Sequence, residues 1–148
     1  IGASYVDSEG KPQKIVMGCY GMGPSRIMGT LAECLSDDKG LIWPESVAPF
    51  QLHLVSLARD AAEIAKADAL YEDLQARGFT VLYDDRVGPQ AGEKLADADL
   101  LGIPHRLVIS KKTIAAGTLE YKHRRTAVTE LLPLEVILDK LEGLQKTP

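Results

Sequence analysis

Several features are scarce or missing in this sequence, and each absence excludes a class of protein. The 148 residues include only two cysteines, Cys19 and Cys34, which form neither a disulfide framework nor a close metal-binding pair. No apolar run approaches the ~18 residues of a membrane span. Residues 1–10 lack the basic start and apolar core of a signal peptide. We therefore expect a cytoplasmic protein with no membrane partner.

Positive charge is also in short supply overall. The net charge of −4 argues against a protein that coats nucleic acid by bulk electrostatics. Basic residues nevertheless gather in one short window that contains a single acid, Glu120: Arg106, Lys111, Lys112, Lys122, Arg124 and Arg125. Such a patch fits either a specific, limited phosphate contact or a sheet edge defended by Lys and Arg. The charge pattern leaves both interpretations open.

The centre of the chain carries a clear secondary-structure pattern. Residues 81–83 and 107–109 are short apolar runs, and the segment between them repeats apolar residues at helical spacing. Gly102 ends this helix and Pro104 prevents its resumption. Two apolar strands joined by a helix predict a βαβ unit, with a parallel sheet covered on its faces.

Other elements follow from similar signals, and 148 residues suffice for one ordinary domain plus an appendage. In chain order we expect hairpin strands at 4–6 and 14–17, a helix from Pro24, a linker at 44–49, a strand at 51–57, a helix at 59–77, the βαβ unit, a loop at 111–117, strands at 118–121 and 127–131, and a final helix from Pro133. The overall prediction is an α/β protein.

A glycine-rich stretch, GCYGMGPSRIMG, precedes the first predicted helix. It is not a dinucleotide-binding fingerprint, because Arg26 occupies the third glycine position after Gly21 and Gly23. Bare backbone at the two glycines lets a flat ligand lie against the chain, and Arg26 offers a charged fork to phosphate or base. The alternative is a glycine-rich strand–helix corner with a surface arginine.

These residues resemble a known family. VMGCYGMGPSRIMGTLAE resembles motif 3 of class II aminoacyl-tRNA synthetases, in the form found in bacterial-type prolyl-tRNA synthetases. The resemblance continues through the junction into the anticodon-binding domain of that family and through the body of the domain, in GLIWPESVAPFQLHLV, LYEDLQARGFTVLYDDR, LADADLLGIPHRLVIS and LEYKHRR. Pro24 departs from the usual aliphatic residue but suits a helix start.

The resemblance implies a two-part chain. Residues 1–47 would be the end of the class II catalytic domain, a strand–helix remnant of its antiparallel sheet. Residues 48–148 would be an anticodon-binding domain with a mixed, mainly parallel sheet flanked by helices. Motif 3 binds ATP, which implies that Gly21 and Gly23 floor the ATP site and that Arg26 is the catalytic arginine.

Motifs 1 and 2 of class II synthetases have no counterpart in this sequence. We therefore expect a C-terminal piece of a larger enzyme, with open apolar sheet edges near residues 5–20. The piece alone would be inactive and would bind no cofactor tightly. The full-length enzyme is expected to be a homodimer that ligates proline to tRNA(Pro) through prolyl-adenylate, with ATP and Mg²⁺.

The resemblance also implies an anticodon reader. Proline anticodons end in two guanines, whose N1–H and N2–H suit one carboxylate and whose O6 and N7 suit an arginine fork. Unpaired loop bases are open to such contacts. The matching family positions are Asp99 and Arg106, while a third, acidic in some members, falls on Thr113. Asp84 and Arg86 are expected to line the same end of the sheet, either positioning the loop or forming a structural ion pair.

Two other interpretations compete with the synthetase. One is a non-catalytic RNA-binding or accessory module derived from a class II synthetase. The intact Gly21, Gly23 and Arg26 argue against it, because a module that only binds RNA does not need an ATP-binding motif. The other is a flavodoxin-like nucleotide binder, which lacks support because residues 56–60 contain no glycine. No pair of the three histidines has the spacing of a metal site, so we predict no metal ligands.

Overall fold

A five-stranded mixed sheet forms the centre of the protein. The computed structural model describes residues 2–145, with side chains described through Leu141. The sheet order is β6-β5-β7-β8-β9. Its strands are β5 (Leu52–Ser56), β6 (Val81–Asp84), β7 (His105–Ile109), β8 (Leu119–His123) and β9 (Thr129–Leu132). The pairings of β5 with β6 and β7 are parallel, whereas β7–β8 and β8–β9 are antiparallel, which confirms the predicted mixed α/β sheet.

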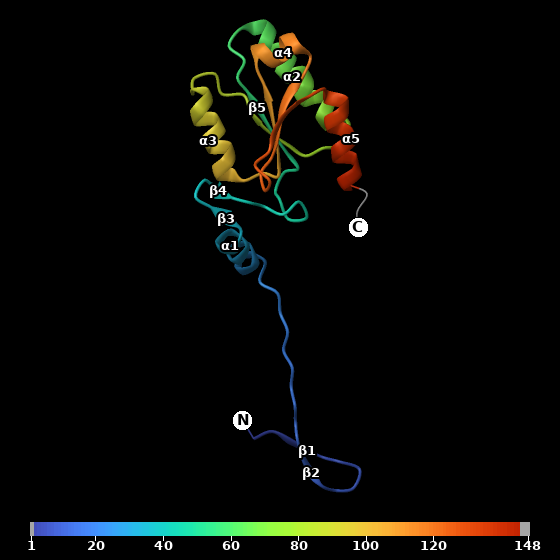
Figure 1. The fold of residues 1–148 in the computed structure, drawn as a ribbon. Coiled ribbons are helices and arrows are strands. Elements are labelled where there is room, and N and C mark those ends of the chain that lie inside the picture. Colours follow the sequence, from blue (N-terminus) through green and yellow to red (C-terminus); the bar gives the residue numbers. More distant parts are fainter. Residues whose placement is uncertain (1, 146–148) are drawn as a thin grey trace.

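Helices cover both faces of this sheet (Figure 1). Helices α2 (Ala61–Ala76) and α5 (Leu134–Gln145) pack on one face, against the alternating side chains of Leu52, Leu54 and Leu107. Helix α3 (Ala91–Leu101) covers the opposite face, where its Ala98 meets Val55 and Val108. The period-2 alternation of each strand therefore fixes which residues face which helix.

Local residues define the helix ends. Helix α2 begins two residues later than expected, because Asp60 caps it by accepting a hydrogen bond from the backbone N–H of Glu63 at 2.8 Å. Gly102 ends α3 with a φ of 70°, the left-handed conformation for which glycine was expected there. A Cβ on Gly102 would collide with the backbone of Leu41, so this glycine also permits close approach of a neighbouring segment.

That neighbouring segment is a short hairpin of β3 (Ser36–Asp37) and β4 (Gly40–Leu41), which the sequence analysis did not predict. It packs against the end of α3 so closely that a Cβ on Gly40 would collide with the backbone of Leu100. Residues before the predicted boundary at 47 therefore contact the α/β domain. The boundary itself stays a prediction.

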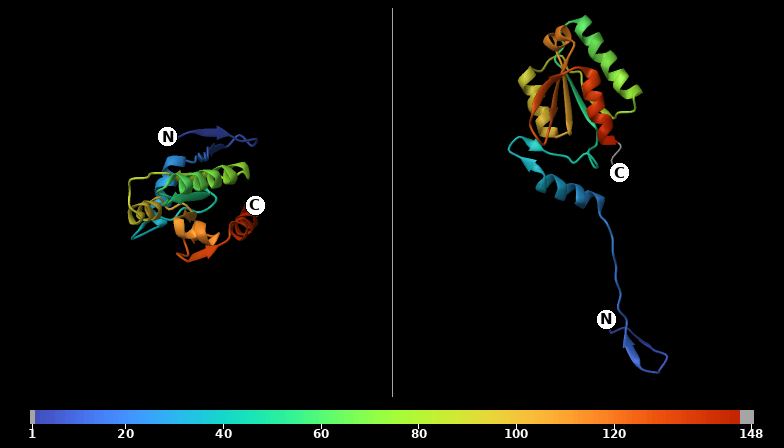
Figure 2. Two further views of the ribbon diagram at one scale, coloured as in Figure 1. Left: turned by 90° about the horizontal axis from the view of Figure 1, so that it is seen from above. Right: turned by 45° about the vertical axis from the view of Figure 1, so that its right-hand side comes forward.

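The described residues of the N-terminal region, 2–23, have no core of their own. Within the described part of the chain, strands β1 (Ser4–Val6) and β2 (Pro12–Lys14) pair only with each other, and residues 15–23 form no regular structure. The predicted second strand, 14–17, is thus wrong except for its first residue. Figures 1 and 2 show this hairpin standing away from the α/β domain, joined through an extended stretch to helix α1 (Pro24–Cys34).

The predicted loop at 111–117 is also wrong, because it contains helix α4 (Lys111–Ala116). Ser110 and Thr113 form a capping box, and Gly117 ends the helix with a φ of 64°. Six residues are too few to show a helical period of apolar residues, so only the capping residues could have indicated this helix in the sequence. Among the described residues, no helix has the length and apolar character that crossing a membrane requires.

Candidate nucleic-acid interface

The predicted anticodon residues Asp99 and Arg106 lie side by side where α3 packs on the sheet. Arg106 is the second residue of β7 and points to the α3 face of the sheet, opposite the face that receives Leu107. Its antiparallel partner on β8 is Lys122, so the two cationic side chains are neighbours on one face. Asp99 lies near the carboxyl end of α3 and completes the cluster.

The cluster is a dense, nearly buried ion-pair network. Arg106 donates a hydrogen bond from Nη1 to Asp99 Oδ1 at 3.0 Å, and Lys122 Nζ donates to both Asp99 oxygens at 2.7 and 3.0 Å. The side chains of Arg106, Lys122 and Asp99 are 9%, 10% and 17% exposed. Among the described residues, the buried Nε of Arg106 has no hydrogen-bond partner. The site therefore presents opposite charges in fixed positions and retains an unused donor.

Arg124 ties this cluster to the preceding segment. Its Nε donates to the backbone oxygen of Asp99 at 3.1 Å, and its two terminal nitrogens grip the Asp37 carboxylate at 2.8 and 2.6 Å. These hydrogen bonds from Arg124 hold the pKa of Asp37 well below its usual value. The bidentate geometry anchors β3 beside the candidate interface.

Asp84 and Arg86 form a second cluster. Arg86 binds Asp84 through two hydrogen bonds of 2.9 and 2.8 Å and reaches Asp97 of α3 at 2.8 Å. Burial acts to raise the pKa of Asp84, but hydrogen bonds from Arg86 and the charge of Lys94 outweigh it and hold that pKa at about 2. The ion pair considered at this strand end is therefore present.

The two clusters do not line the same end of the sheet. Asp84 is the last residue of β6 and lies level with Val108 in the parallel register, whereas Arg106 is near the start of β7. The expectation that both pairs line the same end of the sheet is therefore wrong. Arg106 follows the Gly-Ile-Pro turn and lies near the beginning of its strand, whereas Asp84 lies at the end of its own. A cleft of about 390 Å³ lies beside the second cluster, lined by His53, Asp84, Arg86, Asp97 and hydrophobic residues of β6 and α3.

Sequence reasoning missed Lys94 and placed Lys122 only in the basic patch, with no part in the anticodon cluster. Lys94 is fully buried in α3, where its Nζ donates to the backbone oxygens of Ser56 at 2.7 Å and Asp84 at 3.2 Å. Neither lysine differs locally from a surface lysine. Strand pairing places Lys122 beside Arg106, and the packing of α3 on the sheet places Lys94 against the carbonyls at the ends of β5 and β6. Thr113 uses its hydroxyl in the cap of α4 and is buried.

The predicted ATP residues lie apart from these clusters. Gly21 and Gly23 belong to the irregular stretch before α1, and Arg26 sits exposed in the first turn of that helix. No residue of α1 is buried. The ATP site therefore stays a prediction.

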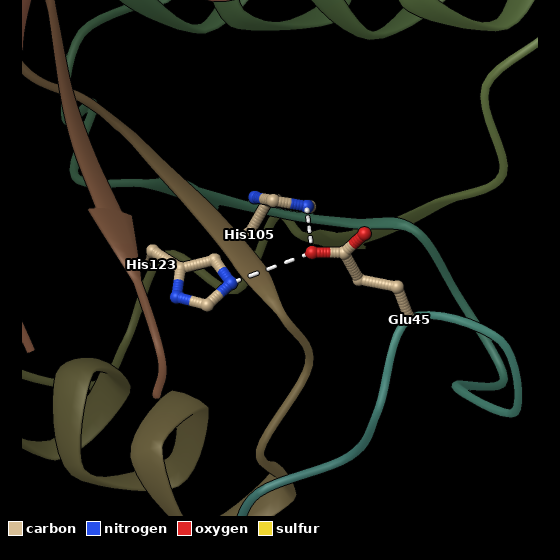
Figure 3. Close-up of side chains that lie close together, drawn as sticks. All are labelled: Glu45, His105 and His123. Atoms are coloured by element: carbon tan, nitrogen blue, oxygen red, sulfur yellow. Dashed lines mark ion pairs between the residues drawn. The ribbon is translucent and has the colours of Figure 1, made fainter. Parts of the chain in front are cut away.

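A third group, Glu45, His105 and His123, had no signal in the sequence. Figure 3 shows both imidazoles pointing toward the Glu45 carboxylate, with each Nε2 at 3.5 Å from Oε1. Burial lowers the pKa of His105 to about 4, so its ring is neutral at pH 7.

Comparisons with known proteins agree with the predicted resemblance. The anticodon binding domain family matches residues 47–144. Over 137 residues, or 91% of this chain, the sequence is 47% identical to a Proline--tRNA ligase of Burkholderia vietnamiensis and 46% identical to one of Burkholderia ambifaria. The chain spans only 24% of the length of each of these relatives. The match over residues 47–144 shows that the chain belongs to the family of anticodon-binding domains.

Proposed function

We propose that this chain is the anticodon-reading part of a proline–tRNA ligase. The observation that carries the proposal is the Asp99–Arg106–Lys122 cluster, which holds a carboxylate and an arginine fork within hydrogen-bonding distance of each other. The names of the relatives, all called Proline--tRNA ligase, support the ligase over the accessory module.

The proposed recognition exchanges one set of partners for another. In the free protein the Asp99 carboxylate accepts hydrogen bonds from both Arg106 and Lys122. A guanine entering the cluster would donate N1–H and N2–H to Asp99 and accept the Arg106 fork at O6 and N7. Lys122 would then remain as a cation for the adjacent phosphate or second guanine, a role that Thr113 cannot take because its hydroxyl caps α4. Asp84 and Arg86 would hold the neighbouring strand end in place.

The remaining assignments concern the whole enzyme. Residues 1–47 would belong to the end of a class II catalytic domain, with Arg26, Gly21 and Gly23 at its ATP site. Proline, ATP with Mg²⁺, tRNA(Pro), a homodimeric assembly and a cytoplasmic location would follow for that enzyme. This chain alone would show no proline-dependent pyrophosphate exchange, since a single ATP-binding arginine does not make an active site.

Binding to two tRNA transcripts at one fixed, moderate salt concentration tests the proposal. The first is a proline tRNA transcript and the second has both anticodon guanines replaced. We expect a loss of about 1–3 kcal/mol per guanine. Arg106→Lys keeps the charge but loses the planar fork, so it should bind both transcripts equally while retaining most of the non-specific affinity. Asp99→Asn should behave in the same way, because an amide has only one accepting oxygen.

The control is Arg77→Ala, which removes an exposed arginine paired with Asp73 on α2, on the other face of the sheet. It should leave discrimination between the transcripts intact. Equal binding of both transcripts by the unaltered chain would contradict the anticodon assignment and leave the basic patch as a phosphate contact only.

A further inference from the structure

Three potential metal ligands converge on the face of the sheet opposite the anticodon cluster. His105 and His123 are directly paired across β7 and β8. Each neighbours a residue of the proposed RNA site in sequence, Arg106 and Lys122, but alternation sends the histidines to the other face. Glu45 reaches them from the linker at 44–49 (Figure 3).

The distances among these atoms do not describe hydrogen bonds. Both histidine Nε2 atoms lie 3.5 Å from Glu45 Oε1, which exceeds the 2.7–3.2 Å typical of N–H···O bonds. Three ligands at roughly 2.0–2.1 Å from a tetrahedral ion would be separated by about 3.4 Å. The two Nε2–Oε1 distances match this separation, and all three atoms lie within 4.8 Å of one another.

The surroundings of His105 also suit a ligand. Its Nδ1 lies 3.0 Å from the hydroxyl of the buried Tyr121. With Nδ1–H donating to that oxygen, the lone pair of Nε2 is directed at the site. A partner that fixes the tautomer and orientation of the ring is usual for metal-bound histidine. Glu45 is 44% exposed, which leaves a path for the ion and for water.

We propose that Glu45, His105 and His123 bind one Zn²⁺ ion, or a divalent cation of similar softness, with water as the fourth ligand. Two imidazoles and one carboxylate suit zinc better than Mg²⁺ or Ca²⁺, which prefer all-oxygen sites. The ion fastens the linker to β7 and β8. It thereby fixes the path of the chain from α1 into the α/β domain, directly behind the anticodon cluster.

Zinc titration of the untagged chain tests this site. The exposed thiols of Cys19 and Cys34 also bind zinc, so the parent protein carries Cys19→Ser and Cys34→Ser. Competition against a chromophoric chelator should show one tight Zn²⁺ per chain, and Co²⁺ should give the intense visible absorption of a tetrahedral site. Glu45→Gln and His123→Asn should each weaken binding at least ~100-fold, more than the ~10-fold expected for Tyr121→Phe.

Glu72→Gln is the matched control, since it removes an exposed carboxylate of α2 away from the site. Because Glu45 is partly exposed, Glu45→Gln should keep the circular dichroism spectrum of the parent. Zinc should also slow proteolysis within residues 44–49 in the parent but not in Glu45→Gln. Absence of stoichiometric binding, or equal affinity of Glu45→Gln and the parent, would overturn the site. Tight binding without protection would overturn the fastening of the linker.

Discussion

The N-terminal residues 2–23 and the α/β domain contain similar side chains but bury them very differently. Tyr20 is 98% exposed and Val16 95%, whereas Leu54 and Leu107 are fully buried. The difference is not one of hydrophobicity. Burial requires a second layer to pack against, and the hairpin of β1 and β2 has none among the described residues, whereas the sheet from β5 to β9 has helices on both faces.

The comparison also explains the behaviour of charge. In the hairpin, Lys11 pairs with Glu9 in full contact with water. In the domain, Lys94 is buried and its ammonium is satisfied by two carbonyl oxygens and by Asp84 at 3.4 Å. The attraction between a lysine ammonium and a carboxylate is weak where water surrounds both groups and stronger where the protein excludes water from them. Substitutions in the two regions should therefore have very unequal effects.

Apolar truncation should give the largest contrast. Leu54→Ala removes a fully buried side chain from the central strand and should lower the free energy of unfolding by about 4 kcal/mol. Met22→Ala, in the exposed stretch before α1, should leave it unchanged. Urea unfolding followed by circular dichroism measures both midpoints. A clear loss of stability in Met22→Ala would mean that the N-terminal region packs on the domain in solution.

Removal of a buried charge should come next. Lys94→Met preserves the volume of the stem but leaves the Ser56 and Asp84 carbonyls without their donor, and we expect a loss of about 3 kcal/mol. Lys11→Met in the hairpin should cause no measurable change. The same urea experiment at several salt concentrations separates the two, because a buried pair is poorly screened. Equal effects of the two substitutions would contradict the burial of Lys94.

The smallest of these effects concerns pH and His53. Burial lowers the pKa of His53 to about 4, while Asp84 and Asp97 act to raise it and Arg106 and Arg86 to lower it. In the unfolded chain His53 therefore becomes protonated near pH 6.5, whereas in the folded protein it becomes protonated only near pH 4. Stability should fall as the pH drops from 6.5 toward 4, by about 2 kcal/mol at pH 5 for this residue alone.

His53→Gln should reduce that slope, measured by urea unfolding between pH 7 and pH 4 with a chelator present. Part of the slope should remain, since burial lowers the pKa of His105 to the same value. An unchanged slope in His53→Gln would show that His53 is accessible to protons in the folded state. Residues 2–23 contain no histidine and should add nothing to the slope between pH 6.5 and pH 5.

Much of the fold was evident from the sequence because its signals are local. The apolar runs at 81–83 and 107–109 indicated β6 and β7, and Gly102, which has a positive φ, indicated the end of α3. The resemblance to the synthetase family, not a local signal, singled out Asp99 and Arg106 on either side of the Gly-Ile-Pro turn. The sequence further determined that these residues flank one turn, and the structure joins them through a hydrogen bond of 3.0 Å.

Tertiary structure alone decided the remainder. Lys122 joins the cluster, and His123 meets His105, only because β7 and β8 pair in one particular antiparallel register. The β3–β4 hairpin lies on α3 only because two glycines permit backbone contact. Lys94 is buried because carbonyls from two different strands converge on it. These features depend on residues far apart in the chain, and no local periodicity or propensity encodes which distant groups will meet.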